Sequence, residues 1–525
     1  MAFTFQINKD VVWNHDKGLL QKAEENKPAL NKKKVVPKQI VELINDPSKL
    51  GDVGIIPKTT DLSELDTTQF KRDESVILDF GNHFVGHFNI DIDSVGSPMD
   101  APLTLKVKFA EMASELSSSS EDYNGWLSRS WIQEELLHID ELPVRLEFPR
   151  RYAARFVELT VVDTSPKWSV VFSNPVVIAE SAVDFDSVIL RDTGDKMLNR
   201  INSVATKTLM DCMQDVFEDG PKRDRRLWLG DLRLQALANY ATFDNTQLVK
   251  RGLYLFGGMT AKDGRIPANV FVKPNIVPDD TFLFDYSVFF AATLADYVEH
   301  TDDLETLKNL YDVAKKQIDF TFQYVDEDGR LTLPEDYPAF IDWSNDFDKA
   351  TAAQATLIFG LKKFIILTKL MDDNNSELYV AELDKLINFT KEVLFDRENN
   401  QFIVERTGEV NIASQVWMVL AGVMDSSTNQ LIMEQMIHTQ FPVTGIATPY
   451  MYHHIAEALF VADMADEAKK LIKQYWGTMI ELGADTFWEA FEPENPNYSP
   501  YGSPIVSSYC HAWSCTPVYL TKKYL

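Results

Sequence analysis

The chain is 525 residues long, and its 51 Lys and Arg against 79 Asp and Glu give a formal net charge of −28. A chain of this length exceeds what one hydrophobic core supports, so two or more domains are expected. The negative charge argues against nucleic acid and against an anionic membrane surface as partners. It is compatible with plain solubility or with a neutral ligand such as a sugar.

The cysteines and the N-terminal sequence indicate a cytoplasmic protein. The three cysteines, Cys212, Cys510 and Cys515, are odd in number and lack metal-site spacing, which fits a reducing compartment. The opening MAFTFQINKDVVWNHDKG lacks the apolar core of a signal peptide, and no run approaches the length of a membrane span. We expect no cofactor and no metal. Even His453 and His454 would point about 100° apart on a helix.

The first predicted elements are strands. In LTLKVKFAE (103–111), LPVRLEF (142–148) and FVELTVV (156–162), apolar residues alternate with polar ones. Such alternation is typical of half-buried antiparallel strands. Turn-forming segments separate these strands, so the pattern predicts a β-sandwich over 61–182. Residues 1–60, rich in Lys, Asn and Pro, are expected to form an arm or partial strands.

After residue 190 the hydrophobic period becomes helical. Leu198, Ile201, Ala205, Cys212 and Val216 follow helical spacing up to the break at Gly220-Pro221. Further helical runs lie near 231–243, 246–259, 284–299, 303–324, 350–371, 377–395, 411–423, 427–438, 451–462, 464–481 and 505–521. Twelve helices in adjacent pairs predict an (α/α)6 barrel over 190–525. No fixed-length self-similarity supports the alternative, a repeat solenoid.

Four loops between the paired helices combine acids with aromatic residues. They are DGPKRDRRLWLGD (219–231), RIPANVFVKPNIVPDDTFLFDY (265–286), LPEDYPAFIDWSNDFD (333–348) and GADTFWEAFEPENPNYSPYGSP (483–504). Flat aromatic faces stack on sugar rings, while carboxylates and arginines bind hydroxyl groups. The loops therefore predict a carbohydrate cleft at one end of the barrel.

Three of these stretches resemble one family. DGPKRDRRLWLGD resembles the signature of the bacterial α-L-rhamnosidases (glycoside hydrolase family 78), roughly Asp-Cys-Pro, an acid, Gly-Trp and a final Asp. GADTFWE resembles that family's Gly-Ala-Thr-Thr-aromatic-Trp-Glu segment, and IDWSNDF resembles its Asp-Trp loop. The predicted order of β-sandwich and (α/α)6 barrel also resembles the family, over most of residues 75–525.

The resemblance implies an inverting, exo-acting glycosidase that acts on small rhamnosides or similar sugars. One carboxyl group protonates the leaving oxygen and another activates a water, about 6.5–9.5 Å away. By position, the family implies Asp224 as the acid and Glu489 as the base. The residues implied to bind the sugar are Asp219, Arg223, Trp228, Asp231, Asp342, Trp343, Trp488 and His511. The alternative is a non-catalytic sugar-binding or regulatory protein that keeps the pocket.

The sequence departs from the family pattern in several ways. Asp224 stands where the family usually has Glu, which shortens the reach by one methylene. Gly220 replaces the usual Cys, and Leu227 replaces the Gly before the Trp. The sequence also stops at TKKYL, directly after the last helix, where family members often continue into another β-domain.

Each candidate residue also has a structural alternative. Asp231 could cap a helix, Asp224 could pair with Arg225 or Arg226, Glu489 could have a structural role, and His511 could be a core histidine. Trp343 and Trp488 could be core or rim aromatics. If the site exists, we expect arginines (Arg223 and Arg226) to hold the aspartates. Asp219 and Asp231 would then stay ionised, and Asp224 would lie in an apolar setting. A homodimer is compatible with the sequence.

Overall fold

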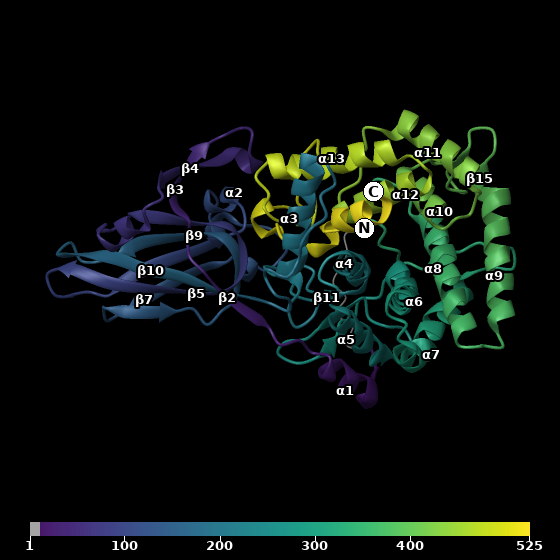
Figure 1. Ribbon diagram of the computed structural model, residues 1–525, viewed down its shortest axis with the longest axis horizontal. Helices are drawn as coiled ribbons and strands as arrows, with labels where there is room; N and C mark the ends of the chain where they lie inside the picture. The colour runs from purple at the N-terminus through teal and green to yellow at the C-terminus, as the bar shows by residue number, and fades with distance from the viewer. Residues whose placement is uncertain (1–10) are drawn as a thin grey trace.

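The computed structural model describes residues 11–525, which form a β-domain and a helical domain (Figure 1). The β-domain contains one antiparallel nine-stranded sheet. Its strands are β2 (Asn31–Val35), β3 (Gln39–Asn45), β4 (Val53–Thr59), β5 (Ser75–Gly96), β6 (Leu103–Ala110), β7 (Glu134–Ile139), β8 (Val144–Glu147), β9 (Tyr152–Asp163) and β10 (Trp168–Ser181).

The long strand β5 holds the β-sandwich together. Its first part pairs with β3 and β9, and its later part pairs with β8 and β10. On β6, Leu103, Leu105 and Val107 are fully buried, whereas Thr104 and Lys106 are partly exposed. The alternation seen in the sequence is therefore the alternation between the sandwich core and its surface.

Residues 1–60, expected to form an arm or partial strands, do contain strands, but these do not form a segment apart from the two domains. Strands β2, β3 and β4 belong to the sheet, so the β-domain begins near residue 31 rather than 61. By contrast, β1 (Trp13–His15) pairs with β12 (Met259–Ala261), and α1 (Lys17–Glu25) packs on the helical domain. Strand β2 (NKKKV) is rich in Lys, and β3 and β4 bury few of their residues, so the sequence shows no clear alternation there. Residues 1–10 of this segment lie outside the described residues.

The helical domain is the expected (α/α)6 barrel. Its twelve helices are α3 (Lys196–Cys212), α4 (Leu229–Ala241), α5 (Thr246–Gly257), α6 (Phe284–Thr301), α7 (Leu304–Thr321), α8 (Ala350–Leu370), α9 (Ser376–Phe389), α10 (Ile412–Leu420), α11 (Ser426–Gln440), α12 (Pro449–Val461), α13 (Ala465–Glu481) and α14 (Pro517–Tyr524). The even-numbered helices contact one another in a ring that α14 closes onto α4, and the odd-numbered helices pack around them.

One inner helix corrects the expectation about membrane-length runs. Within the described residues, α8 is long and apolar enough to cross a membrane, but 72% of its most apolar window is buried inside the protein. An inner barrel helix is apolar on nearly all sides because it packs on both neighbours and on the barrel axis. The burial accounts for its composition.

Candidate active site

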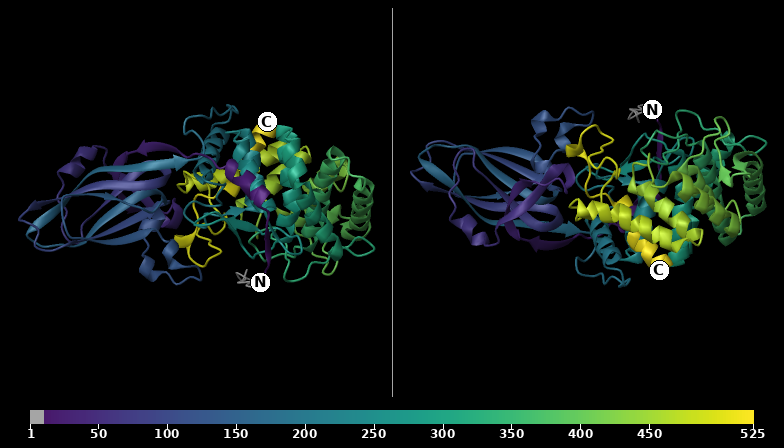
Figure 2. Two further views of the ribbon diagram at one scale, coloured as in Figure 1. Left: turned by 90° about the horizontal axis from the view of Figure 1, so that it is seen from below. Right: turned by 90° about the horizontal axis from the view of Figure 1, so that it is seen from above.

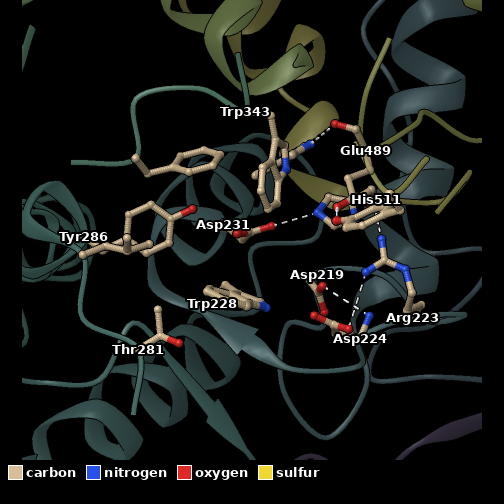
Figure 3. A pocket seen from close by; sticks show the side chains of 14 residues that line it. Asp219, Arg223, Asp224, Trp228, Asp231, Thr281, Tyr286, Trp343, Glu489 and His511 are labelled. Atoms are coloured by element: carbon tan, nitrogen blue, oxygen red, sulfur yellow. Dashed lines mark hydrogen bonds and ion pairs between the residues drawn. The ribbon is translucent and has the colours of Figure 1, made fainter. Parts of the chain in front are cut away.

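A pocket lies where the four acidic, aromatic loops meet, at the end of the barrel from which α4 and α6 begin (Figure 3). Aromatic side chains, Trp228, Tyr286 and Trp343, lie around one side, and acidic and basic groups lie around the other. The full lining is Asp219, Arg223, Asp224, Trp228, Asp231, Thr281, Leu283, Tyr286, Phe340, Trp343, Glu489, Tyr501, His511 and Trp513.

The first loop is held closed by its own backbone and by the next loop. Asp219 N–H donates to Arg226 O (2.9 Å), and β11 (Leu227–Trp228) pairs with β13 (Asn269–Phe271) of the second loop. A Cβ at Gly220 would lie 2.4 Å from Arg223 O and from Ser508 Oγ. The close approach explains why Gly, rather than the family's Cys, stands at this position in this chain.

One buried arginine connects two of the predicted catalytic residues. Arg223 is 2% exposed, and its Nη2 contacts Glu489 Oε2 while its Nη1 lies 3.5 Å from Asp224 Oδ1. Its Nε donates to Val506 O (3.0 Å), and its guanidinium lies 4.0 Å from the Tyr501 ring centre. Burial alone would lower the pKa of Arg223, but the Glu489 carboxylate raises it overall. The guanidinium therefore stays charged between the two carboxylates.

The charge arrangement differs from the one expected. Asp224 lies between two arginines, Arg223 and Arg226 (3.9 Å), rather than in an apolar setting. Asp219 accepts hydrogen bonds from the backbone N–H groups of Arg226 (2.9 Å) and Asp224 (3.3 Å), not from a guanidinium. Burial, and then the charge of Asp224, raise the pKa of Asp219 to about 7. The expectation that arginine side chains hold Asp219 is therefore wrong, and its raised pKa runs against the expected full ionisation.

Asp231 faces His511 across the pocket floor. Asp231 Oδ1 lies 3.3 Å from His511 Nε2, and both side chains are buried. Burial raises the pKa of Asp231, against the opposing effect of His511. Burial alone would lower the pKa of His511, but the Glu489 and Asp231 carboxylates raise it overall. The N-cap of α4 is Trp228, so the helix-cap alternative for Asp231 is wrong.

Glu489 is fixed in place by several groups. Its Oε1 accepts from the Tyr501 hydroxyl, and its backbone carbonyl accepts from Trp513 Nε1 (2.9 Å). With Oε2 on Arg223, each carboxylate oxygen has a donor, and the side chain is only 4% exposed. This carboxylate is therefore held rigidly at the pocket wall.

The comparisons with known proteins agree with this geometry. Residues 37–179 match the N-terminal domain of the family 78 α-rhamnosidases, and residues 190–525 match the bacterial α-L-rhamnosidase six-hairpin glycosidase domain. The chain belongs to glycoside hydrolase family 78. The resemblance of the loops is thereby confirmed, and the protein is a glycosidase.

Solved structures give the same result. A rhamnosidase from Klebsiella oxytoca, solved with rhamnose bound, is 40% identical with a TM-score of 0.95, over 98% of this chain and 100% of that one. A family 78 rhamnosidase from Bacillus sp. GL1 shares the fold at 21% identity and a TM-score of 0.71, over 85% of this chain and 45% of that one. No match was found among curated proteins.

Two predicted site residues of this family 78 glycosidase lie outside the pocket. Asp342 is fully buried and accepts from the N–H groups of Ser344 and Ala447 (both 2.9 Å) and from the Thr448 hydroxyl. It therefore braces its loop against the start of α12. Trp488 is 1% exposed and packs on Phe491 and Tyr509 in the core. Both assignments to the sugar site are wrong, because the neighbours Trp343 and Glu489, not these side chains, reach the pocket.

Other lining residues were not singled out from the sequence. They are Thr281, Leu283, Tyr286, Phe340, Tyr501 and Trp513. All but Trp513 belong to loops that the sequence did identify, so the loops carried a signal and the individual residues did not. Trp513 lies two residues after His511, in the segment before α14, where a bulky aromatic also fits a core role.

A possible metal cluster lies outside the pocket. His83, Asp211 and Cys510 bring three potential ligand atoms within 4.8 Å of one another. His83 Nδ1 lies 2.6 Å from Asp211 and its Nε2 lies 3.1 Å from Glu111. Both ring nitrogens thus already contact carboxylates, and these contacts account for the cluster as ion pairs.

Asp231→Asn is expected to weaken sugar binding by about 1–3 kcal/mol, because a buried acceptor loses its charge and one of its two accepting oxygens. Titration calorimetry with L-rhamnose would measure the change. Glu457→Gln is the matched control, since this buried carboxylate lines a second cavity that shares no lining residue with the pocket: it should lower thermal stability and leave the affinity unchanged. Wild-type affinity in Asp231→Asn would show that the sugar binds elsewhere.

Proposed function

We propose that the protein is an inverting, exo-acting α-L-rhamnosidase that releases terminal rhamnose from small rhamnosides. Asp224 is the general acid and Glu489 is the general base. The observation that carries the proposal is the single Arg223 guanidinium, which contacts both carboxylates. The rhamnose bound in the Klebsiella oxytoca relative supports a small carbohydrate as the ligand.

The bridging arginine limits how far apart the two carboxylates can be. Their facing oxygens are separated by no more than the width of one guanidinium and its two contacts. In inverting glycosidases the two carboxyl groups are roughly 6.5–9.5 Å apart, which leaves room for a water between the base and the sugar. The largest separation that Arg223 allows here is shorter than the upper end of that range. The geometry is therefore compatible with the single-displacement mechanism that the family resemblance implies.

The remaining groups would bind and orient the sugar. Asp231, His511 and Asp219 offer buried hydrogen-bonding groups to hydroxyls, and Trp228, Tyr286 and Trp343 offer ring faces and edges. Arg223 would hold Glu489 in position for the water. Asp224 would donate its proton to the leaving oxygen, and the released sugar would carry the inverted configuration at its anomeric carbon.

A panel of 4-nitrophenyl glycosides tests the substrate assignment. We expect release of 4-nitrophenol from the α-L-rhamnoside and little or none from the α-L-fucoside, β-D-glucoside or β-D-glucuronide. Preferred turnover of another glycoside would contradict rhamnose as the substrate. Tight binding of L-rhamnose with no turnover of any compound would favour the non-catalytic alternative over the proposed activity.

The proposal also includes a cytoplasmic location and no nucleic-acid or membrane partner. All three cysteines are buried and unpaired, as a reducing compartment favours. Cell fractionation would test the location. For the assembly, the sequence allows a homodimer, which a mass measurement by light scattering tests directly.

A further inference from the structure

The active-site loop is tied to the β-domain by a buried lysine. Lys222, next to Arg223, is 2% exposed, and its Nζ lies 2.6 Å from Glu115 Oε1 and 3.2 Å from Glu111 Oε2. Glu111 directly follows β6, and Glu115 lies in the short helix α2 (Ala113–Leu116). Both views in Figure 2 show the blue segment after β6 beside the yellow loops that precede α14. Two carboxylates of the β-domain thus form ion pairs with a lysine in a loop of the barrel.

Glu111 also binds the segment that contains the pocket residue His511. The same Oε2 that contacts Lys222 accepts the backbone N–H of Tyr509 (2.7 Å), two residues before His511. Its Oε1 lies 3.1 Å from His83 Nε2 on β5. One β-domain carboxylate therefore joins the loop of Asp224 to the segment of His511.

The cluster has little freedom to rearrange. Glu115 Oε2 accepts from the backbone N–H groups of Glu111 (2.7 Å) and Met112 (2.8 Å), which fixes its side chain. Burial alone would lower the pKa of Lys222, but Glu115 and Glu111 raise it overall, so the ammonium stays charged. Because the cation balances two buried carboxylates, removing it would leave them with much less positive charge to balance them, although Glu111 keeps its contact with His83.

We propose that Glu111, Lys222 and Glu115 form an interdomain clamp that positions the proton donor. The clamp fixes Lys222 in the loop, and Asp224 follows only two residues later. Proton transfer depends on placement, because a shift of about 1 Å can cost roughly 10²-fold in rate. Glu111, Lys222 and Glu115 are positioning residues: they reach the reaction through the loop. The inference rests on the proposed function, in which Asp224 is the acid.

The leaving-group dependence of Lys222→Met tests the clamp. A misplaced acid impairs substrates that need protonation, such as methyl α-L-rhamnoside, and spares 4-nitrophenyl α-L-rhamnoside, whose leaving group needs little. We expect kcat/KM to fall up to about 10²-fold on the methyl glycoside and to stay within about threefold on the 4-nitrophenyl glycoside. Lys222→Arg, which keeps the charge, should recover most of the loss.

A purely structural role predicts a different pattern. Partial unfolding would reduce both activities by the same factor, so equal losses, or no loss, would overturn the clamp. The control is Glu457→Gln, which removes a buried carboxylate held by Lys523 (3.1 Å) and Tyr519 (2.9 Å), in a second cavity that shares no lining residue with the pocket. It should reduce thermal stability without changing the ratio of the two activities.

Two further variants keep the test decisive. Should Lys222→Met not fold, the double variant Lys222→Met, Glu115→Gln removes one charge of each sign and should show the same selective loss. Asp224→Asn in the same assays separates this inference from the proposed function. If Asp224→Asn impairs the methyl glycoside selectively and the clamp variants do not, the clamp alone is overturned. If Asp224→Asn shows no such selectivity, both the clamp and the proposed role of Asp224 as acid are overturned.

Discussion

Glu489→Gln is expected to abolish turnover of every rhamnoside, with kcat falling by about 10²–10⁴-fold or more. The amide oxygen can still accept from Arg223, and the amide NH2 group can donate to the Tyr501 hydroxyl oxygen, so the pocket should keep its shape. It cannot take a proton from the attacking water, and that step is common to all leaving groups. Initial rates on 4-nitrophenyl α-L-rhamnoside, measured at saturating substrate, would give the loss.

The matched control for this variant lies in the same loop. Glu494 is exposed and lies outside the pocket, so Glu494→Gln should turn over as the wild type does. L-Rhamnose affinity should be retained in Glu489→Gln, which separates a chemical loss from a binding loss. Full activity of Glu489→Gln would remove Glu489 from the role of base.

Asp224→Asn is expected to affect substrates according to their leaving groups. For alkyl rhamnosides kcat should fall by about 10²–10⁴-fold, because the alkoxide leaves only when protonated. For 4-nitrophenyl α-L-rhamnoside the loss should be about tenfold or less, since 4-nitrophenolate is a stable leaving group. A plot of log kcat against the leaving-group pKa should therefore become steep in the variant and stay shallow in the wild type.

Asp219 is the alternative candidate for the general acid, and the same leaving-group assays can exclude it. Its pKa is raised to about 7, so it can hold a proton at neutral pH, and its carboxylate accepts from the Asp224 backbone N–H. Asp219→Asn should weaken sugar binding and leave the leaving-group slope shallow. A steep slope in Asp219→Asn, with a shallow one in Asp224→Asn, would make Asp219 the acid.

Periodicity predicted most of the fold from the sequence. The alternation in LTLKVKFAE and the helical spacing after residue 190 each reflect a face buried in the core of its own domain, so burial and pattern coincide. Periodicity did not predict the strands before residue 60. Only a few of their residues, such as Ile40 and Val41, are buried. Tertiary pairing with β5 and β10, which no local pattern reports, completes them.

The site was predictable at the level of loops more than of side chains. Acids and aromatics concentrate in the four loops because a sugar pocket needs both, and all four loops meet there. Which of two adjacent side chains faces the pocket depends on the backbone conformation at single residues. Trp343 faces the pocket and Asp342 does not, and Glu489 faces it and Trp488 does not. The partners of the aspartates also depend on the folded loop, in which backbone N–H groups hold Asp219 and Arg223 turns to Glu489.

Proton NMR of the first-formed sugar tests the central claim most directly, because two carboxylates acting across a water must invert the anomeric centre. Spectra recorded within the first minutes of hydrolysis of 4-nitrophenyl α-L-rhamnoside, before mutarotation, should show β-L-rhamnose appearing first and α-L-rhamnose only later. First appearance of α-L-rhamnose would mean a double displacement through a covalent intermediate, and would contradict the assignment of Asp224 and Glu489 as an acid and base acting through water.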